Sequence, residues 1–519
     1  MDYDALIIGS GFGGSVAALR LSEKGYRVAV IEQGRRLSRE DIEKANRSPL
    51  HLFWVPALGL KGIFTQRFFQ HVNVVGGVGV GGGSLVYAAV LLEPKQAFYH
   101  DPAWSGMGID WASELNPHYR TAARMLGRVT CPTSHVQDDL LKKTAVALNV
   151  AHTFGPVPLG IYFGNENSPD PFFNGEGPMR SGCIECGACL AGCVNGAKNT
   201  LDKNYLYLAE KLGAQILPGR KATLIRSIAD GYSIEIVNPL SGMKYPPLTT
   251  RKLILAAGVL GTLELLFASQ ARGTMANLSP MLGRRVRTNS EAITGVLHPD
   301  KSVDMTHGPA ISSDFHPNEQ THVTQNRLPS SYWFMKLYSG PLVDGFNPLT
   351  RALKTFLHFI LHPLESTASL FTFKDWHKRI TLISTMQNKD NQIAFTWGRG
   401  LFSGFRKGLQ SVTPSGKRAP TYIPEANEAA RTYAKVSGGT PHNALLESVL
   451  NMSVTAHILG GCPIGADAEH GVIDSNHEVF GYPGMYVVDA SAIPANVGVN
   501  PSLTITAMAE RAMSLMPKK

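Results

Sequence analysis

Long apolar runs are absent from this sequence. Two apolar stretches, residues 52–69 and 352–373, are interrupted by proline and by charged or histidine side chains, so neither reaches the length of a membrane-spanning helix. Asp2 and Asp4 occupy positions where a secretory signal would carry positive charge. We therefore expect a protein of the cytoplasm, with peripheral attachment to a membrane as an open alternative.

Runs of basic residues are absent too. Lys and Arg total 49 against 40 Asp and Glu, a net charge of +9, but they are scattered along the chain. Scattered basic residues do not make the patch that binds nucleic acid, so no such partner is expected. The chain of 519 residues exceeds one ordinary hydrophobic core, which predicts more than one domain.

The first thirty residues have the pattern of a dinucleotide-binding unit. An apolar strand over residues 4–8 leads into a Gly-x-Gly-x-x-Gly turn, a helix over 13–24 and a second strand over 28–32 that ends in an acid. The pyrophosphate would lie on the helix N-terminus, and the acid would bind the ribose. The residues expected at the dinucleotide are Gly9, Gly11, Phe12, Gly13, Gly14 and Glu32.

Further segments of the same kind recur far along the chain. A glycine-dense stretch without helix or strand pattern follows residue 80, and it suggests backbone packed against a flat ligand. Short strands are expected over 213–226, 253–258 and 485–490, and a helix over 503–515 with Glu510 and Arg511 on its polar face. A dinucleotide fold split over hundreds of residues favours a buried FAD over a nicotinamide cofactor. The residues expected at the ligand in the glycine stretch are Gly81, Gly82, Gly83 and Ser84.

These motifs, together with the His457–Gly461 and Asn500–Thr504 segments, resemble the glucose–methanol–choline (GMC) oxidoreductases, and within them the bacterial cholesterol oxidase branch. The resemblance implies an α/β plus β fold: a Rossmann-like FAD-binding domain with an interleaved substrate domain on an antiparallel sheet. The FAD-binding domain would comprise residues 1–90, 195–295 and 450–519. The substrate domain would comprise 91–180 and 296–449, with a cysteine-rich segment over 181–200.

The same resemblance implies FAD-dependent oxidation of an alcohol. It places the backbone of Ala222 near the adenine, and Asp489 and Ala490 near the ribityl–pyrophosphate. His457 would take the hydroxyl proton while a hydride leaves for flavin N5, and Asn500 would complete the catalytic pair. Asn500 can form hydrogen bonds but cannot take a proton at neutral pH, so His457 carries the acid–base role.

One departure from the family bears on the substrate. Cholesterol oxidases of this type use a glutamate to isomerise the steroid double bond, but the matching stretch, residues 321–327, contains no acid and has Gln325 instead. Either another residue such as Glu291 serves as the base for isomerisation, or the enzyme oxidises the alcohol without isomerising the double bond. The family's Asn in the flavin glycine loop is replaced by Tyr87. We therefore expect an apolar alcohol, sterol-like or long-chain, and a lyase of the same family remains an alternative.

Cysteine is scarce, yet four of the six fall within eleven residues. Cys183, Cys186, Cys189 and Cys193 have the spacing of a ferredoxin-type iron–sulfur segment, although Val194 replaces the usual proline. Some bacterial GMC dehydrogenases carry a cluster in a similar segment. A cluster would pass electrons to a protein or quinone acceptor. Reduced thiols or a disulfide are the alternatives, and oxygen would then be the acceptor.

Residues 352–376 show apolar side chains at helical spacing, among them Leu353, Phe356 and Ile360. Two interpretations stay open. The helix packs on its own substrate domain, or it forms a lipid-facing lid that contacts a membrane transiently and admits an apolar substrate.

Overall fold

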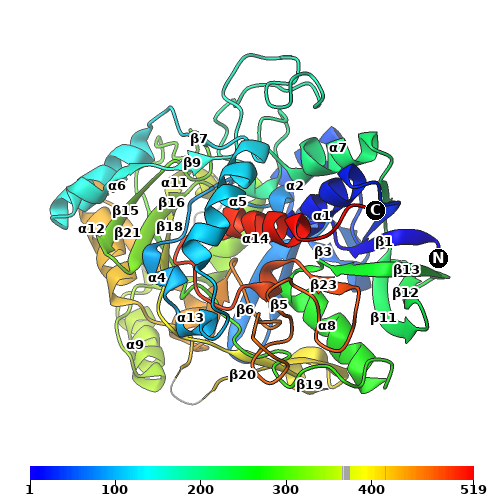
Figure 1. Cartoon of the computed structure of the whole chain (residues 1–519). Coiled ribbons are helices and arrows are strands. Elements are labelled where there is room, and N and C mark those ends of the chain that lie inside the picture. Colours follow the sequence, from blue (N-terminus) through cyan, green and yellow to red (C-terminus); the bar gives the residue numbers. More distant parts are fainter. Residues whose placement is uncertain (365, 368–374, 415–416) are drawn as a thin grey trace.

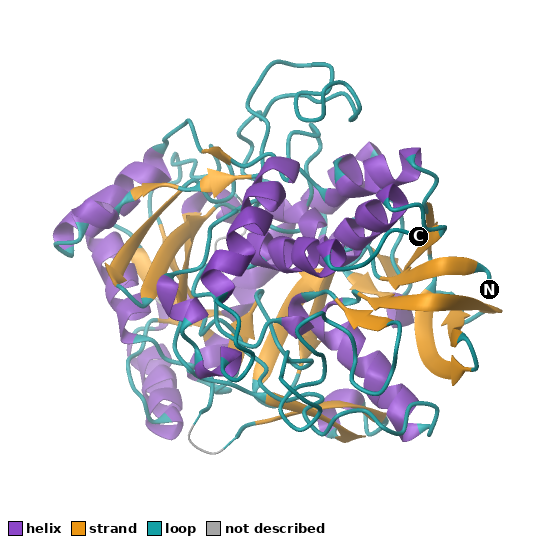
Figure 2. Cartoon of the chain, in the orientation of Figure 1, coloured by secondary structure: helices purple, strands orange, loops and turns teal. Residues whose placement is uncertain are grey.

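A computed structural model describes residues 1–364, 366–367, 375–414 and 417–519 (Figure 1). Two large sheets organise the chain, and helices pack on both of them (Figure 2). Residues 162–185 form a long loop without helix or extended strand.

The first sheet is the dinucleotide-binding sheet. It runs in the order β10 (Gln215–Pro218), β2 (Val28–Glu32), β1 (Tyr3–Ile8), β13 (Lys244–Leu255), β12 (Gly231–Val237) and β11 (Lys221–Ile228), with β23 (Met485–Val487) paired to the end of β13. The strands from β10 to β13, and β23, are parallel, whereas β11, β12 and β13 form an antiparallel meander. The short apolar strands are buried on both faces, as expected where helices cover a parallel sheet.

Helices from opposite ends of the chain cover this sheet. On one side α1 (Phe12–Glu23) packs against α14 (Ser502–Ser514) and α7 (Tyr205–Lys211), and α5 (Trp111–Met125) packs on α14; α8 (Gly258–Ala271) packs on β11 (Figure 1). Glu510 is buried and accepts hydrogen bonds from Arg20 of α1 and Tyr205 of α7. The prediction that Glu510 and Arg511 lie on a polar face of α14 is therefore wrong, because both side chains are buried against partners on neighbouring helices.

The second sheet is antiparallel throughout. Its order is β17 (Ser339–Pro341), β21 (Thr440–Ala444), β14 (Ala292–Leu297), β18 (Ile380–Gln387), β16 (Thr321–Asn326), β15 (Ser313–Asn318) and β8 (Gly155–Pro156). Helices α6 (Val136–Ala147) and α12 (Pro424–Ser437) cover one face, where Leu141 and Tyr433 pack against Phe315 and Val323. The domain boundaries drawn from the sequence stay a prediction; residues 91–180 supply helices to both halves, α5 and α6.

Smaller elements connect these layers. The short strands are β3 (Trp54–Val55), β4 (Leu60–Lys61), β5 (Phe64–Phe68), β6 (Val72–Gly77), β7 (Val129–Thr130), β9 (Pro158–Leu159), β19 (Ala394–Arg399), β20 (Lys407–Val412) and β22 (Ser453–Thr455). Further α-helices of the described residues are α2 (Arg39–Arg47), α3 (Pro49–Leu52), α4 (Gln96–Tyr99), α9 (Pro348–Leu361), α11 (Trp376–Arg379) and α13 (Leu445–Ser448). The pairing of β22 with β6 matters for the site, because it brings residue 455 beside residue 74 and so near the second glycine turn.

The sequence-based expectation for residues 352–376 is met in part. A helix, α9, is present, but it begins at Pro348 and ends at Leu361, and the expected segment continues into residues outside the described ranges. Among the described residues, no helix is both long and apolar enough to cross a membrane.

Candidate active site

The first glycine turn lies where β1 ends and α1 begins, and backbone approaches it closely from two sides. A Cβ on Gly13 would lie 2.0 Å from the Val488 carbonyl oxygen, and one on Gly14 would lie 2.0 Å from the Gly9 oxygen. A Cβ on Gly11 would meet no described atom within 4 Å, so protein packing does not require glycine there. Gly11 also begins α1 without a side-chain cap, which leaves backbone N–H groups free for an anion. These features fit a dinucleotide pyrophosphate.

The second glycine turn packs directly on the first. A Cβ on Gly82 would lie 2.6 Å from the Cα of Gly11. Ser84 closes the turn by donating to the Gly81 oxygen at 2.7 Å. The turn is a short 3₁₀ helix over Gly82–Leu85 rather than the irregular loop expected from the sequence. Gly83 and Phe12 face each other, and a Cβ added to the glycine would lie 3.8 Å from the ring.

Glu32 holds the two turns in register. Its Oε2 accepts hydrogen bonds from the backbone and hydroxyl of Ser10, and its Oε1 accepts from the Gly34 N–H at 2.8 Å. The Ser10 hydroxyl in turn accepts from Gly81 N–H at 3.1 Å. Burial raises the pKa of Glu32, and these hydrogen bonds oppose the rise. The carboxylate retains lone pairs for a ribose hydroxyl, which fits the expected role.

The residues expected nearer the flavin and adenine lie in two places. Asp489 follows β23, and its backbone nitrogen lies 3.2 Å from a Cβ placed on Gly13. Its carboxylate, however, accepts from Gly258 N–H, Thr262 and Ser491, so it anchors the start of α8. Ala490 contributes its carbonyl to Gly460 N–H at 2.9 Å. Ala222 lies on β11 at a β-bulge.

His457 and Asn500, forty-three residues apart, lie side by side, and a third residue orients them. Asn500 Nδ2 is 3.3 Å from His457 Nε2, and Glu291 Oε1 is 2.9 Å from His457 Nδ1. Because a carboxylate only accepts hydrogen bonds, Nδ1 carries the ring hydrogen and Nε2 presents its lone pair toward Asn500. The Asn500 Oδ1 atom is buried and has no hydrogen-bond partner among the described residues.

Glu291 is nearly fully buried and is hydrogen-bonded to the end of β22 and to the segment after it, which carries His457. The Thr455 hydroxyl lies 2.7 Å from Glu291 Oε1, and the backbone N–H groups of Ala456 and His457 donate to the carboxylate at 3.0 and 3.1 Å. A buried carboxylate with this many donors is held rigidly. The imidazole is thereby fixed in one orientation.

Asn289 connects the glutamate segment to the asparagine segment. Its side chain donates to the Val499 carbonyl at 2.8 Å and accepts from Gly498 N–H at 2.7 Å. Asn289 and Ser290 both have left-handed backbone, with φ of 60° and 47°. Such conformations are held only by surrounding contacts, and here they direct Glu291 toward His457.

The sequence named Glu291 only through its nearness to residues 321–327 and missed its contact with His457. Gln325, the residue matched to the family's glutamate, points toward α6. Its amide donates to Asp138 of α6 at 2.6 Å and to two serines. The alternation of side chains along β16 places Gln325 on the same face as Val323, which packs on α6 and α12. Tyr87 donates to the Asn199 carbonyl and stacks edge-on against Phe12.

The cysteine-rich segment lies next to the second glycine turn. Lys198, fully buried, donates to the carbonyls of Leu85, Tyr87 and Cys189 at 2.9, 3.1 and 2.6 Å. Burial lowers the pKa of Lys198 to about 8. One cation thus joins the glycine turn to the cysteines.

The cysteines themselves are all free thiols, so the disulfide alternative is not what the structure has. Cys189 is buried, Cys186 is exposed, and burial raises the pKa of both Cys183 and Cys189, the latter to about 11. Within the described residues, the four sulfurs do not converge as ligands of a single ion. Four thiols on one loop are the donor type that an iron–sulfur cluster needs, and the cluster stays a prediction.

Comparison with known proteins identifies the family. The model of the GMC oxidoreductases matches residues 380–509, and that of the NAD(P)-binding Rossmann-like domain matches residues 7–54. The chain is 43% identical to a cholesterol oxidase of Mycobacterium tuberculosis, over 100% of this chain and 92% of the relative. This chain belongs to the GMC oxidoreductases. A GMC oxidoreductase is an FAD-dependent enzyme that oxidises CH–OH groups, and the expected family and fold are confirmed.

Other similar proteins agree. This GMC oxidoreductase is 41% identical to a cholesterol oxidase of Acinetobacter baumannii, over 100% of this chain and 95% of the relative. It is 25% identical to a long-chain-alcohol oxidase of Arabidopsis thaliana, over 98% of this chain and 66% of the relative. Its fold matches the crystal structure of pyridoxine 4-oxidase from Mesorbium loti with a TM-score of 0.65, 16% identity and 98% coverage of each chain.

Replacement of Gly11 by alanine should separate cofactor binding from folding. The added methyl group meets no described protein atom, so we expect a melting temperature close to that of the wild type. The methyl would obstruct the approach of the pyrophosphate and weaken FAD binding by about tenfold or more, roughly 1.4 kcal/mol. The ratio of flavin to protein absorbance after gel filtration measures this loss.

Gly13→Ala is the matched control. Its methyl group would collide with the Val488 carbonyl, so folding and flavin should be lost together. Full flavin occupancy in the Gly11→Ala protein would contradict this placement of the cofactor.

Proposed function

We propose that this protein is an oxidase of an apolar alcohol, sterol-like or long-chain, with His457 as the base. The contact that carries the proposal is the pair formed by Glu291 Oε1 and His457 Nδ1 at 2.9 Å, because it leaves Nε2 free of hydrogen and directed at Asn500. The bound FAD would accept the hydride. Dioxygen is the acceptor favoured by the relatives, which are named oxidases.

His457 takes the hydroxyl proton at Nε2 in this proposal. The ring becomes an imidazolium, and the Glu291 carboxylate beside Nδ1 stabilises that positive charge without accepting the proton itself. Both groups are largely shielded from water, His457 with 19% and Glu291 with 3% of the side chain exposed, which strengthens their attraction.

Asn500 positions the hydroxyl group. Its Nδ2 can donate to the alcohol oxygen once substrate displaces the contact with His457, and its buried Oδ1, unpaired among the described residues, can accept from substrate or cofactor. Glu291 is already bound to three donors and His457, and residues 321–327 hold no acid. We therefore propose that the alcohol is oxidised and that residues 321–327 relay no proton for isomerisation.

An outward-facing apolar surface supports delivery of the substrate from a membrane or micelle. Helix α9 buries Arg351 and Thr355 and exposes its apolar side chains, the reverse of a helix that packs its apolar face on its own domain. The exposed apolar side chains, from 46% to 82% exposed, are Leu349, Leu353, Phe356, Leu357, Ile360 and Leu361. Apolar residues gathered on one exposed helix face are typical of contact with lipid.

Arg351 attaches this helix near the site. The guanidinium donates to the Thr421 carbonyl at 2.7 Å and to the carbonyl of Glu447. Glu447, in turn, accepts from Ile293 N–H, two residues after Glu291. If α9 moves as a lid on the membrane, its movement would therefore reach β14, the strand that begins directly after Glu291.

Replacement of His457 by alanine, or of Glu291 by glutamine, should slow flavin reduction. We expect His457→Ala to lose about 10²- to 10⁴-fold, the range of a general base, while FAD stays bound. Glu291→Gln should lose at least about tenfold through a lower kcat, because the amide no longer stabilises the imidazolium. The rate of flavin reduction in both variants is measured as anaerobic stopped-flow bleaching by cholesterol and by a long-chain alcohol.

Glu447→Gln is the control for Glu291→Gln. Burial raises the pKa of Glu447 to about 8, so it is protonated at pH 7 and an amide replaces it with little change. Unchanged bleaching in His457→Ala would exclude the proposed base. Product formation without any bleaching in the wild type would instead support a lyase.

Substitution of Phe356 and Ile360 by serine should weaken membrane binding. Each apolar side chain stabilises the bound state by about 1.5–3 kcal/mol when fully buried, so the double variant should bind at least tenfold less. Co-sedimentation with phosphatidylcholine–phosphatidylserine vesicles that contain cholesterol measures the membrane binding of each protein. A variant at two exposed leucines elsewhere, Leu58→Ser with Leu212→Ser, should bind as the wild type does. Equal sedimentation of all three proteins would count against the lid.

Iron and acid-labile sulfide analysis of anaerobically purified protein tests the cysteine segment. A cluster held by Cys183, Cys186, Cys189 and Cys193 predicts stoichiometric iron and sulfide, which Cys189→Ser should lower. Iron at background level would exclude a cluster and would leave the oxidase proposal unchanged.

A further inference from the structure

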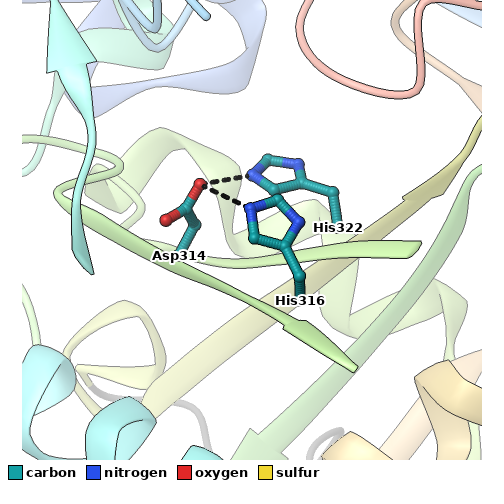
Figure 3. Close-up of side chains that lie close together, drawn as sticks. All are labelled: Asp314, His316 and His322. Atoms are coloured by element: carbon teal, nitrogen blue, oxygen red, sulfur yellow. Dashed lines mark hydrogen bonds and ion pairs between the residues drawn. The ribbon is translucent and has the colours of Figure 1, made fainter. Parts of the chain in front are cut away.

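A second group of chemically active side chains lies at the edge of the antiparallel sheet. Asp314 and His316 are two residues apart on β15, and His322 lies on the paired strand β16, in the stretch where the register between the two strands shifts. Figure 3 shows both imidazole rings turned toward the Asp314 carboxylate. Oδ2 of Asp314 is 2.9 Å from His322 Nε2 and 3.8 Å from His316 Nε2. One ligand atom from each residue lies within 4.8 Å of the others.

Hydrogen bonding fixes the state of the His316 ring. Its Nδ1 is 3.2 Å from the Thr321 carbonyl, which only accepts, so Nδ1 carries the hydrogen. In its neutral form the ring therefore turns a bare Nε2 lone pair toward the Asp314 carboxylate, 3.8 Å away. Two acceptors that face each other repel unless a cation lies between them.

The Asp314 carboxylate also lacks a fixed counter-charge. It is 7% exposed, and within the described ranges no lysine or arginine forms an ion pair with it. Lys95 lies near enough to interact, but its amine donates to the Glu319 carbonyl. A buried carboxylate without a cation is unfavourable, and a bound metal ion supplies one.

We propose that Asp314, His316 and His322 bind a divalent transition-metal ion of the zinc type. Two imidazoles and one carboxylate are the donors that such an ion prefers over magnesium or calcium. Ligand atoms around a tetrahedral zinc ion lie about 3.4 Å apart, and the distances of 2.9 and 3.8 Å lie on either side of that value. Water would complete the coordination.

The Thr321 carbonyl fixes the tautomer that metal binding at His316 Nε2 requires. A metal-binding histidine commonly donates its second ring hydrogen to a backbone carbonyl, which fixes the tautomer, and His316 does so here. His322 would carry its hydrogen on Nδ1, which is buried and unpaired within the part of the chain that the structure describes. The ion would link β15 to β16 where the register between them shifts, and so stabilise the hairpin at the sheet edge. The proposal is independent of the flavin site.

Zinc titration of the chelator-treated holoenzyme tests the site. His316→Ala is the first variant, since this side chain is 28% exposed and its loss leaves no buried cavity. We expect the wild type to bind one zinc ion per chain more than His316→Ala, and zinc to raise the melting temperature of the wild type by several degrees more. The difference between the two proteins removes any contribution of the cysteines, which both retain. Asp314→Asn, which keeps shape and removes charge, should lose the same ion.

His100→Ala, at an exposed histidine outside the group, is the control and should bind as much zinc as the wild type. Cobalt(II) identifies the donors: the difference spectrum of wild type minus His316→Ala should show d–d bands without thiolate charge-transfer absorption. Equal zinc stoichiometry in the wild type, His316→Ala and Asp314→Asn would overturn the proposal. So would a difference spectrum dominated by thiolate absorption. If His316→Ala does not fold, Asp314→Asn alone decides.

Discussion

Close contact between backbones at the start of α1 is the constraint on which the rest of the molecule depends. The carbonyl of Val488, the residue after β23, and the turn at Gly82 both approach the 9–14 turn so closely that no side chain fits at Gly13 or at Gly82. Glycine at these positions lets three distant parts of the chain meet at the expected pyrophosphate site. Glu32 and Ser10 then fix the two turns to each other by hydrogen bonds, so the cradle keeps its shape before any ligand enters.

Much of this cradle could be predicted because its causes are local. Glycine spacing, apolar runs of strand length and a terminal acid each act over a few residues, and the predicted strand–helix–strand order at the N-terminus agrees with the structure to within a residue or two. The antiparallel second sheet was predicted from family resemblance alone. Its strands carry few local signals that specify which neighbour they pair with.

What the sequence did not reveal depends on contacts between distant residues. Glu291 reaches His457 across 166 residues because Asn289 holds a left-handed turn, and no local pattern encodes that partnership. Glu510 looked like a surface acid because its partners belong to α1 and α7. The apolar residues of α9 have the spacing of a core-facing helix, yet Arg351 and Thr355 occupy the inner side. Periodicity identifies a face but not the direction in which it points.

The pairing of β23 with β13 has a consequence for biosynthesis. The ribosome releases the first glycine turn early, but Val488 and α14, which pack against this turn and against α1, emerge only with the last few dozen residues. A nascent chain therefore exposes the bare face of α1 and an unfinished strand edge for most of its synthesis. We therefore expect flavin capture to be a late event that coincides with closure of the sheet, and chains interrupted before residue 485 to be released without cofactor, as substrates for chaperones and proteases.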